Sequence, residues 1–448
     1  MVKSGTIIEA VDNQPWSGEA NVHVSIVNWV KHPAPTTKSG RISITTEEAL
    51  QLPHSRRLWR KVDPSLPLFD GEQANGSRRR ETTVMGKHGR TRKDKSYELT
   101  VSDVAHVSST LSDQTDVSGA KVLKCNTEPQ RVYQGQVPGH EAFVLSPSEA
   151  ASLIRRTDQN AQVIWPFLIG RDIVTGSGEP SRFVIDFQDI DINAASAFAE
   201  PFKRIKEEVL PIRQKAASEG HTADGKPRPH HQLFLRYWWR HSYDRPELIS
   251  TISPLSRYVV CSGVTKRPIF AFVSNRIRPD HAVFVFAFED DYSFGILQSQ
   301  AHWLWFTTKC SKLKSDYRYT PPTVFDTLPW PQAVTKKQVR AVAKAGFEIR
   351  RLRNDALLKT SGGLRGLYRT LELPGKSELR DAHAALDAAV LEAYGFNPKK
   401  DLLAQLLLLN LDVAARIDRG EPVTAPGVPP LYGDATDLVT GDCIRPPA

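Results

Sequence analysis

The sequence has few cysteines and no long apolar run. Its four cysteines, Cys125, Cys261, Cys310 and Cys443, are far apart and form no Cys-x-x-Cys pair, so neither a zinc site nor a disulfide framework is predicted. The amino terminus lacks the apolar core of a signal peptide, and no segment approaches the roughly 20 apolar residues that a membrane span requires. These absences favour a soluble protein of the reducing cytoplasm.

The glycine motifs of nucleotide-binding folds are also missing. The sequence contains neither Gly-x-Gly-x-x-Gly between a strand and a helix nor a Walker sequence. Residues 175–181 hold two glycines, but they precede a predicted strand, and the glycines of residues 361–366 follow a predicted helix and are typical of its stop. No cofactor-binding residue is therefore predicted.

The composition is that of a folded chain with an excess of positive charge. A length of 448 residues allows two or three domains. Lysine and arginine number 59 against 50 for aspartate and glutamate, which gives a net charge of +9. This excess favours a polyanionic partner without identifying it.

The first residues predict a hairpin. Residues 5–11 and 21–30 are strand-like and are joined by a turn-rich segment, and the second run alternates as a half-buried strand does. Such a hairpin needs further strands to complete a sheet. Residues 32–122 are predicted to be a connector with short elements, in which the basic segment 77–96 is a surface loop that at most touches phosphate.

The rest of the chain predicts a mixed α/β fold followed by helices. Residues 123–331 alternate strands and helices, and clustered prolines near residue 330 mark a boundary. Residues 332–420 have apolar positions at helical spacing, and residues 421–448 form a Pro/Gly-rich irregular tail.

Two polar clusters were weighed as catalytic or metal sites, and neither is favoured. The carboxylates of residues 289–292 end a predicted strand, but no second acidic cluster accompanies them, so a solvated turn is preferred. His230 and His231 are neighbours with no ligand set at metal spacing, which favours a loop position. No catalytic or metal-binding residue is predicted.

Three stretches mix basic and other polar or aromatic residues, as nucleic-acid-binding surfaces do. Residues 234–245 interleave arginine with Trp238 and Trp239, although an amphipathic helix with core aromatics is the favoured interpretation. Residues 261–270 form a basic insertion between two apolar runs. Because loops between strands commonly carry recognition residues, we predict that this loop reads base edges through Thr265, Lys266 and Arg267.

The third stretch, residues 312–321, precedes the proline boundary. It contains basic residues beside two tyrosines. We predict that DNA phosphates are bound by Lys314, Arg318, Arg276 and Arg278.

Several long segments resemble one family. They are PWSGEANVHVSIVNW, VYQGQVPGHEAFVLS, WPFLIGRDIV, SRFVIDF, DDYSFGILQSQAHWLW, SKLKSDYRYTPPTVFDTLPWPQ and AHAALDAAVLEAYGF. In this order they resemble the carboxyl-terminal portion of the MmeI-like site-specific adenine DNA methyltransferases, and the resemblance extends over nearly the whole chain. These restriction–modification enzymes often carry a methylase, a target recognition domain and sometimes a nuclease in one polypeptide.

The resemblance implies a division of the chain. Residues 1–31 would be the last strands, and so an incomplete edge, of a Rossmann-like methyltransferase sheet. Residues 123–331 would be the recognition domain for double-stranded DNA, and residues 332–420 a helical carboxyl-terminal domain. In the family, the S-adenosylmethionine motif and the Asn/Asp-Pro-Pro-Tyr/Phe motif for the flipped adenine lie upstream. This sequence has neither, since residues 13–16 read NQPW.

The expected function is therefore recognition without catalysis by this chain. An amino-terminal methyltransferase polypeptide would supply the S-adenosylmethionine site, and the chain alone would be inactive. A stand-alone, non-enzymatic DNA-binding specificity protein is the alternative. A remnant without present function is a third.

Overall fold

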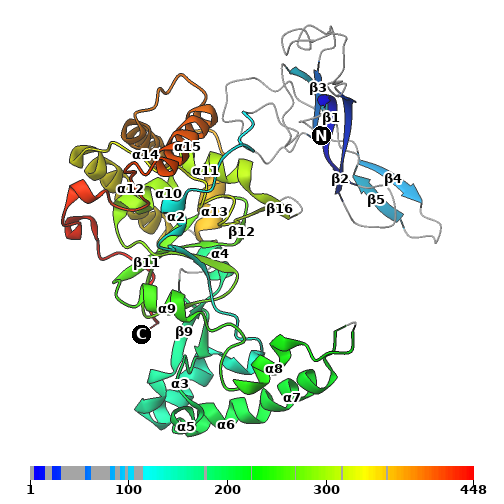
Figure 1. Ribbon diagram of the computed structural model, residues 1–448, viewed down its shortest axis with the longest axis vertical. Coiled ribbons are helices and arrows are strands. Elements are labelled where there is room, and N and C mark those ends of the chain that lie inside the picture. Colours follow the sequence, from blue (N-terminus) through cyan, green and yellow to red (C-terminus); the bar gives the residue numbers. More distant parts are fainter. Residues whose placement is uncertain are drawn as a thin grey trace. The chain divides into compact units, whose positions relative to one another are not determined.

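The computed structural model describes residues 115–447, apart from 176–178, 223, 268, 314–315 and 360–361, and the backbone of six strands between residues 5 and 104 (Figure 1). Residues 311–313 are described by their backbone only. The contacts divide the chain into two units, Met1–Gly119 and Ala120–Ala448.

The first unit contains a mixed four-stranded sheet and a separate hairpin. In the sheet, of order β2-β1-β3-β6, β1 pairs antiparallel with β2 and parallel with β3, and β3 pairs antiparallel with β6. The predicted amino-terminal hairpin is confirmed. The predicted connector supplies β3, which pairs with β1. Its basic segment 77–96 is not the loop that the sequence predicts, because it contains the antiparallel β4–β5 hairpin. The strands are β1 (Gly5–Pro15), β2 (His23–Lys31), β3 (Arg56–Lys61), β4 (Glu81–Met85), β5 (Thr91–Lys95) and β6 (Leu99–Val104).

One part of the second unit is a small sheet packed on helices, with strand order β14-β9-β10-β8. Its core buries side chains such as Phe167, Phe187 and Ile205. Ser146 begins α3 with a capping box to Glu149, because the sequence Ser-Pro-Ser-Glu supplies both partners. The elements are β8 (Val144–Leu145), α3 (Pro147–Arg156), β9 (Ile164–Leu168), β10 (Arg182–Ile185), α5 (Ile192–Ser196), α6 (Ala199–Glu208), α7 (Leu210–Glu219), α8 (Pro229–Arg236) and β14 (Arg278–Pro279).

A second sheet, of order β13-β11-β15-β7, is antiparallel and deeply buried. All six residues of the central strand β11 are buried, including the polar Arg257 and Ser262 at its two ends. A three-stranded sheet, β12-β17-β16, is formed by the segment that follows β11 and the hairpin that follows α11. The elements are α2 (Lys124–Thr127), β7 (Val132–Gln134), α4 (Gly170–Thr175), α9 (Pro246–Ile252), β11 (Arg257–Ser262), β12 (Val264–Thr265), β13 (Phe270–Ser274), β15 (Val283–Phe286), α10 (Asp291–Gln298), α11 (Gln300–Lys309), β16 (Ser311–Leu313) and β17 (Asp316–Arg318).

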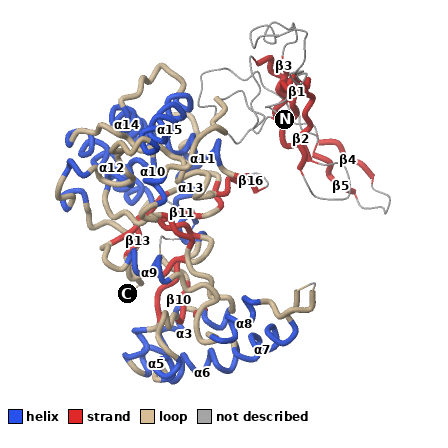
Figure 2. Tube along the Cα trace, in the orientation of Figure 1, coloured by secondary structure: helices blue, strands red, loops and turns tan. Residues whose placement is uncertain are grey.

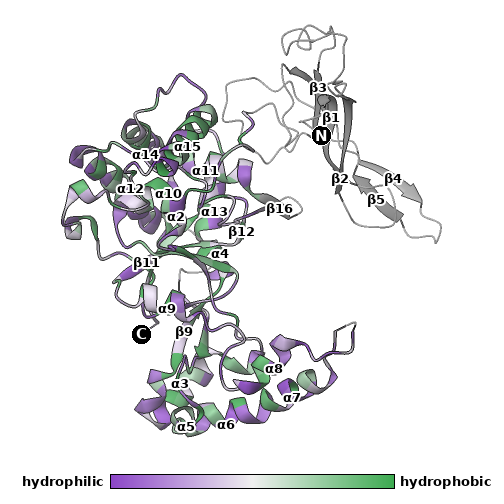
Figure 3. Ribbon diagram, in the orientation of Figure 1, coloured by the Kyte–Doolittle hydropathy of each residue, from purple (hydrophilic) through white to green (hydrophobic). Residues whose placement is uncertain are grey.

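The last part is helical, and its helices gather around α10 and α11 (Figure 2). Helix α12 packs on both α10 and α14. The approach of α12 to α10 depends on glycine, because a Cβ at Gly295 would lie 2.6 Å from Val342. In Figure 3 these helices carry both hydrophilic and hydrophobic colour, as amphipathic helices do. They are α12 (Lys336–Leu357), α13 (Gly363–Thr370), α14 (Glu378–Tyr394) and α15 (Leu402–Asp418).

The fold is thus the mixed α/β class that the sequence predicts, with several small sheets and a helical end. The tail is irregular, as expected, but it is not loose. Ile444 bridges to Val273 of β13, and the Ser274 amide donates to the Ile444 carbonyl at 2.9 Å. Within the part of the chain that the structure describes, no helix has both the length and the apolar character needed to cross a bilayer.

Candidate nucleic-acid interface

The predicted base-reading residues lie on a loop that the small sheet β12-β17-β16 holds. Thr265 of β12 pairs with Tyr317 of β17. The Thr265 hydroxyl donates to the Arg267 carbonyl at 2.5 Å and accepts from the Arg267 amide at 3.1 Å. This short-range pattern is a hydroxyl-closed turn. In this structure Thr265 therefore shapes the loop, and its hydroxyl is already engaged.

Tyr319 ties the loop to the core beneath it. Its amide donates to the Gly263 carbonyl at 3.0 Å, and its side chain is only 2% exposed. The Tyr319 hydroxyl lies 3.0 Å from Nε2 of buried His302, whose Nδ1 lies 2.6 Å from the Leu297 carbonyl. A carbonyl only accepts, so Nδ1 carries the proton and Nε2 accepts from Tyr319. The loop is therefore anchored from α11.

Lys266 and Asp316 face one another across the loop and β17. The Lys266 side chain is 48% exposed, and its ammonium lies 3.8 Å from an Asp316 carboxylate oxygen. That oxygen is buried and has no hydrogen-bond partner among the described residues, whereas the Asp316 side chain as a whole is 41% exposed, so the rest of the carboxylate is open to a ligand. Lysine can donate to guanine, and a carboxylate can accept from the amino group of cytosine. The pair therefore combines a donor and an acceptor suited to base edges.

Sequence analysis missed Asp316. The available signal was a lone acid among the cations of residues 312–318. A small pocket brings Asp316 together with all three predicted base-reading residues and with Arg365 of α13; its lining is Val174, Val264, Thr265, Lys266, Arg267, Ile269, Asp316 and Arg365. The sequence separates these residues, and the tertiary structure joins them.

Arg267 is partly enclosed. Its guanidinium forms an ion pair with Glu372, just beyond α13, and its side chain is 19% exposed. Burial lowers the pKa of Arg267, and the nearby charges of Arg369 and Arg365 lower it further. The loop therefore meets the helical part of the chain through a cluster of cations around one carboxylate.

The four predicted phosphate contacts occupy different environments. Arg318 is exposed on β17, and Arg276 is exposed after β13, while Lys314 lies outside the described residues. Arg278 is 3% exposed, with its guanidinium 3.9 Å from the Trp165 ring centroid and 3.4 Å from the Asp186 carboxylate. Because it is buried between Trp165 and Asp186, Arg278 does not fit the predicted role.

The two tryptophans of residues 234–245 are core, as the sequence favours, but they follow α8 and do not lie on a helix, and Tyr243 is 50% exposed. Trp238 and Trp239 are 9% and 7% exposed and belong to the core of the first small sheet. The Trp239 indole donates to the Ile190 carbonyl at 3.1 Å. These rings therefore pack within the protein and present no stacking platform.

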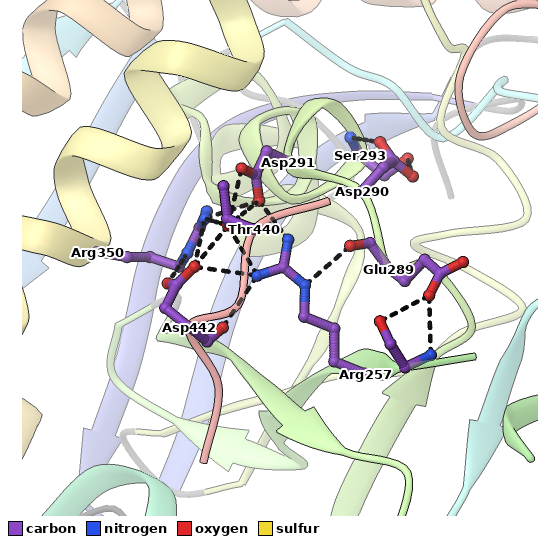
Figure 4. Close-up of polar contacts among 9 residues, drawn as sticks. Arg257, Glu289, Asp290, Asp291, Ser293, Arg350, Thr440 and Asp442 are labelled. Carbon is purple, nitrogen blue, oxygen red and sulfur yellow. Dashed lines mark hydrogen bonds and ion pairs between the residues drawn. The ribbon is translucent and has the colours of Figure 1, made fainter. Parts of the chain in front are cut away.

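The acidic residues 289–292 do not form the solvated turn that the sequence favoured (Figure 4). Asp290 is 7% exposed and begins α10 by accepting from the Ser293 amide at 2.7 Å. Asp291 is 3% exposed and accepts from Arg257 at 2.6 Å and Arg350 at 2.7 Å. The correction arises because distant arginines converge on this position, which local sequence does not reveal.

The tail completes this buried ionic cluster. Asp442 accepts from Arg350 at 2.7 Å and from Arg257 at 3.0 Å, and Thr440 donates to Asp291 (Figure 4). Burial would raise the pKa of Asp442, but the hydrogen bonds and charges of Arg350 and Arg257 lower it overall. Two arginines and two carboxylates thus compensate one another. We assign the cluster a structural role.

The described residues contain no group of histidine, cysteine and acidic side chains able to hold a metal ion. His230 and His231 lie in the first turn of α8, so the loop position that the sequence favours is wrong; Pro229 starts the helix just before them. Their ring centroids are 4.2 Å apart, and the His230 ring also contacts Phe234. A second pocket, of about 400 Å³, is lined by Asn126, Thr127, Gln130, Arg131, Val132, Gln134, Phe284, Pro321, Pro322 and Asp326. It lacks a glycine-rich turn between strand and helix, so it does not fit S-adenosylmethionine.

Comparison with known proteins assigns the region that holds this loop. Residues 120–332 match the family model of the MmeI target recognition domain, so this part of the chain belongs to that class of domain. The family resemblance seen in the sequence is thereby confirmed for this domain.

Two relatives extend the comparison. DNA methyltransferase A of Bacillus subtilis (strain 168) is 26% identical over 222 residues, which are 48% of this chain and 24% of that protein. The Type IIL restriction–modification enzyme MmeI, solved in complex with DNA, shares the fold: the TM-score is 0.61 at 18% identity, over 93% of this chain and 46% of the MmeI chain. The chain thus spans about a quarter of the first relative and about half of the second.

Proposed function

We propose that this chain reads a specific sequence in double-stranded DNA, as the target-recognition portion of a restriction–modification DNA methyltransferase. The match of residues 120–332 to a target recognition domain carries the proposal. The anchored loop supports it, because Lys266 and Asp316 offer a donor and an acceptor at one surface. In this proposal Thr265 shapes the loop, and Lys266, Arg267 and Asp316 contact base edges.

We propose Arg318, Arg276 and Lys314 as phosphate contacts. Arg318 and Arg276 are exposed, and Arg318 lies on the strand that pairs with the loop. Phosphate contacts fix the position of a protein on DNA but carry no sequence information. Arg278 is left out because it is buried against Asp186.

The finer identity of the reaction is also a proposal. We propose that the target is the N6 amino group of adenine, which must leave the base stack to react, and that S-adenosylmethionine supplies the methyl group. The residues that bind both would lie on an amino-terminal methyltransferase polypeptide, and this chain alone would be inactive. A DNA substrate makes the cytoplasm the expected location.

The first test is selection from a pool of synthetic duplexes with a randomised central segment. The full chain should enrich one sequence, because base contacts discriminate among members of the pool. Binding without enrichment would contradict target recognition. Labelled methyl transfer to the enriched duplex, with the product of an adjacent methyltransferase gene co-expressed, tests the finer proposal; enrichment without transfer would favour the stand-alone specificity protein.

Single substitutions separate the two kinds of contact. Lys266→Ala or Arg267→Ala should cost about 1–3 kcal/mol on the enriched duplex and relax the preference at one base pair. Arg318→Ala should weaken binding equally on all duplexes. The slope of log affinity against log salt concentration should become smaller by about one. Fluorescence anisotropy on enriched and scrambled duplexes measures both. A uniform loss for Lys266→Ala would make Lys266 a phosphate contact instead.

A further inference from the structure

We propose that α13, outside the residues that match the target recognition domain, is a second DNA-contacting element. Its exposed arginines, Arg365 and Arg369, would bind backbone phosphates next to the recognition loop. The inference rests on the proposed function, because it extends that DNA surface into the helical part of the chain. Four observations support it.

The first is an uncompensated pair of like charges. Arg365 and Arg369 stand four residues apart on α13, so they occupy the same face of the helix. Both are exposed, and neither has an ion-pair partner among the described residues. Like charges at this spacing destabilise a helix. A polyanion along this face would remove that cost.

The second observation is that this face lies at the recognition loop. Arg365 lines the same small pocket as Lys266, Arg267 and Asp316. The charges of Arg369 and Arg365 also contribute to the lowered pKa of Arg267, so the three cations lie close enough to repel one another. A duplex that reaches Lys266 would therefore meet the arginines of α13 as well.

The third observation is the position of Glu372. This residue follows the carboxyl end of α13, where the helix dipole disfavours a negative charge. It is nevertheless held there, in an ion pair with Arg267. Glu372 is thus the acid that offsets the cationic cluster in the free protein. Phosphate groups would take over part of this role on DNA.

The fourth observation is rigidity. The opposite face of α13 buries Leu364, Leu367 and Tyr368, and the helix packs against α4. Buried Arg353 of α12 donates to the Tyr368 hydroxyl. Because the buried face is fixed in this way, the direction of the exposed face is fixed too. An oriented pair of arginines suits phosphates at fixed positions along a duplex.

The test uses the full chain, the enriched duplex and a scrambled duplex of the same length. Arg365→Ala and Arg369→Ala should each weaken binding to both duplexes several-fold, with the slope of log affinity against log salt smaller by about one per arginine. Arg365→Lys should keep that slope, because the charge is retained. Glu372→Gln should act in the opposite direction, with tighter binding to both duplexes and a steeper slope.

The matched controls are Arg351→Ala and Glu348→Gln. These residues form an exposed ion pair on α12. Their substitutions make the same charge changes as the α13 variants, elsewhere in the helical part. If the α13 variants have the same affinity and salt slope as the controls, the inference is overturned. A loss confined to the enriched duplex would also overturn it, since that marks base contact. If the unaltered chain enriches no sequence, the proposed function itself is wrong.

Discussion

At the scale of single residues, burial separates side chains that look alike in the sequence. Arg276 and Arg278 are two positions apart, and both were predicted to bind phosphate. Arg276 is exposed, whereas Arg278 is enclosed by Trp165 and Asp186. An arginine is available to DNA only where the surrounding structure leaves its guanidinium accessible, and a sequence does not show which residues will cover it.

His302 makes a pH prediction at the same scale. Burial lowers its pKa to about 4, so the folded protein keeps it neutral, whereas an unfolded histidine takes up a proton near pH 6.5. Its contribution to stability is complete above about pH 6.5 and is lost as the pH falls toward about 4.

We therefore expect His302→Gln to reduce the acid sensitivity of the fold. The difference in unfolding free energy between the unaltered chain and the variant should shrink by about 2 kcal/mol from about pH 7.5 to about pH 5. Urea titrations at both pH values measure it. Asp326, whose pKa burial raises to about 6, has the opposite pH dependence, but it is present in both proteins and cancels in the comparison. A constant difference would mean that folding does not lower the pKa of His302.

At the scale of elements, the irregular tail is a structural component. Asp442 accepts hydrogen bonds from both Arg257 of β11 and Arg350 of α12, and Thr440 accepts another from Arg257. Ile444 forms a β-bridge to Val273 of β13. As the Pro/Gly-rich composition predicts, the tail contains no α-helix or strand among its described residues, only two short 3-10 helices, Pro430–Tyr432 and Thr436–Leu438. The composition gives no indication of the ionic cluster, because the partners of Asp442 lie 185 and 92 residues earlier in the chain.

Shortening the tail tests this role. A chain that ends at Leu438 loses Asp442 and leaves Arg257 and Arg350 with one buried carboxylate between them. We expect a loss of about 3–5 kcal/mol in unfolding free energy, because an uncompensated buried charge is costly. A chain that ends at Ile444 keeps the cluster and should match the full length within about 0.5 kcal/mol. Equal losses for both would show that the terminal residues, and not the cluster, stabilise the fold.

At the scale of the whole molecule, the recognition region and the carboxyl-terminal helices share one core. Gly295 of α10 lies against Val342 of α12, and the Phe294 and Ile296 side chains are fully buried. The contact pattern accordingly keeps Ala120–Ala448 as one unit. The matched region 120–332 ends before α12, so by itself it lacks the helix that covers α10.

Two fragments test this. We expect residues 120–448 to unfold in one cooperative transition, because they keep the packing of α10 on α12. Residues 120–332 should aggregate or melt without a cooperative transition, since the α12-facing side of α10 would meet water. Thermal unfolding followed by circular dichroism compares them. A cooperative transition of the shorter fragment would make the recognition region an independent domain.

The sequence by itself determined what local pattern controls. Strand and helix periods indicated the mixed α/β class, and long segments indicated the family. Only the tertiary structure decided which charges meet. Asp316 and Arg365 reach the recognition loop, and Asp291 becomes buried, because chain segments far apart in sequence pack together; periodicity describes each segment alone and holds no information about its partners.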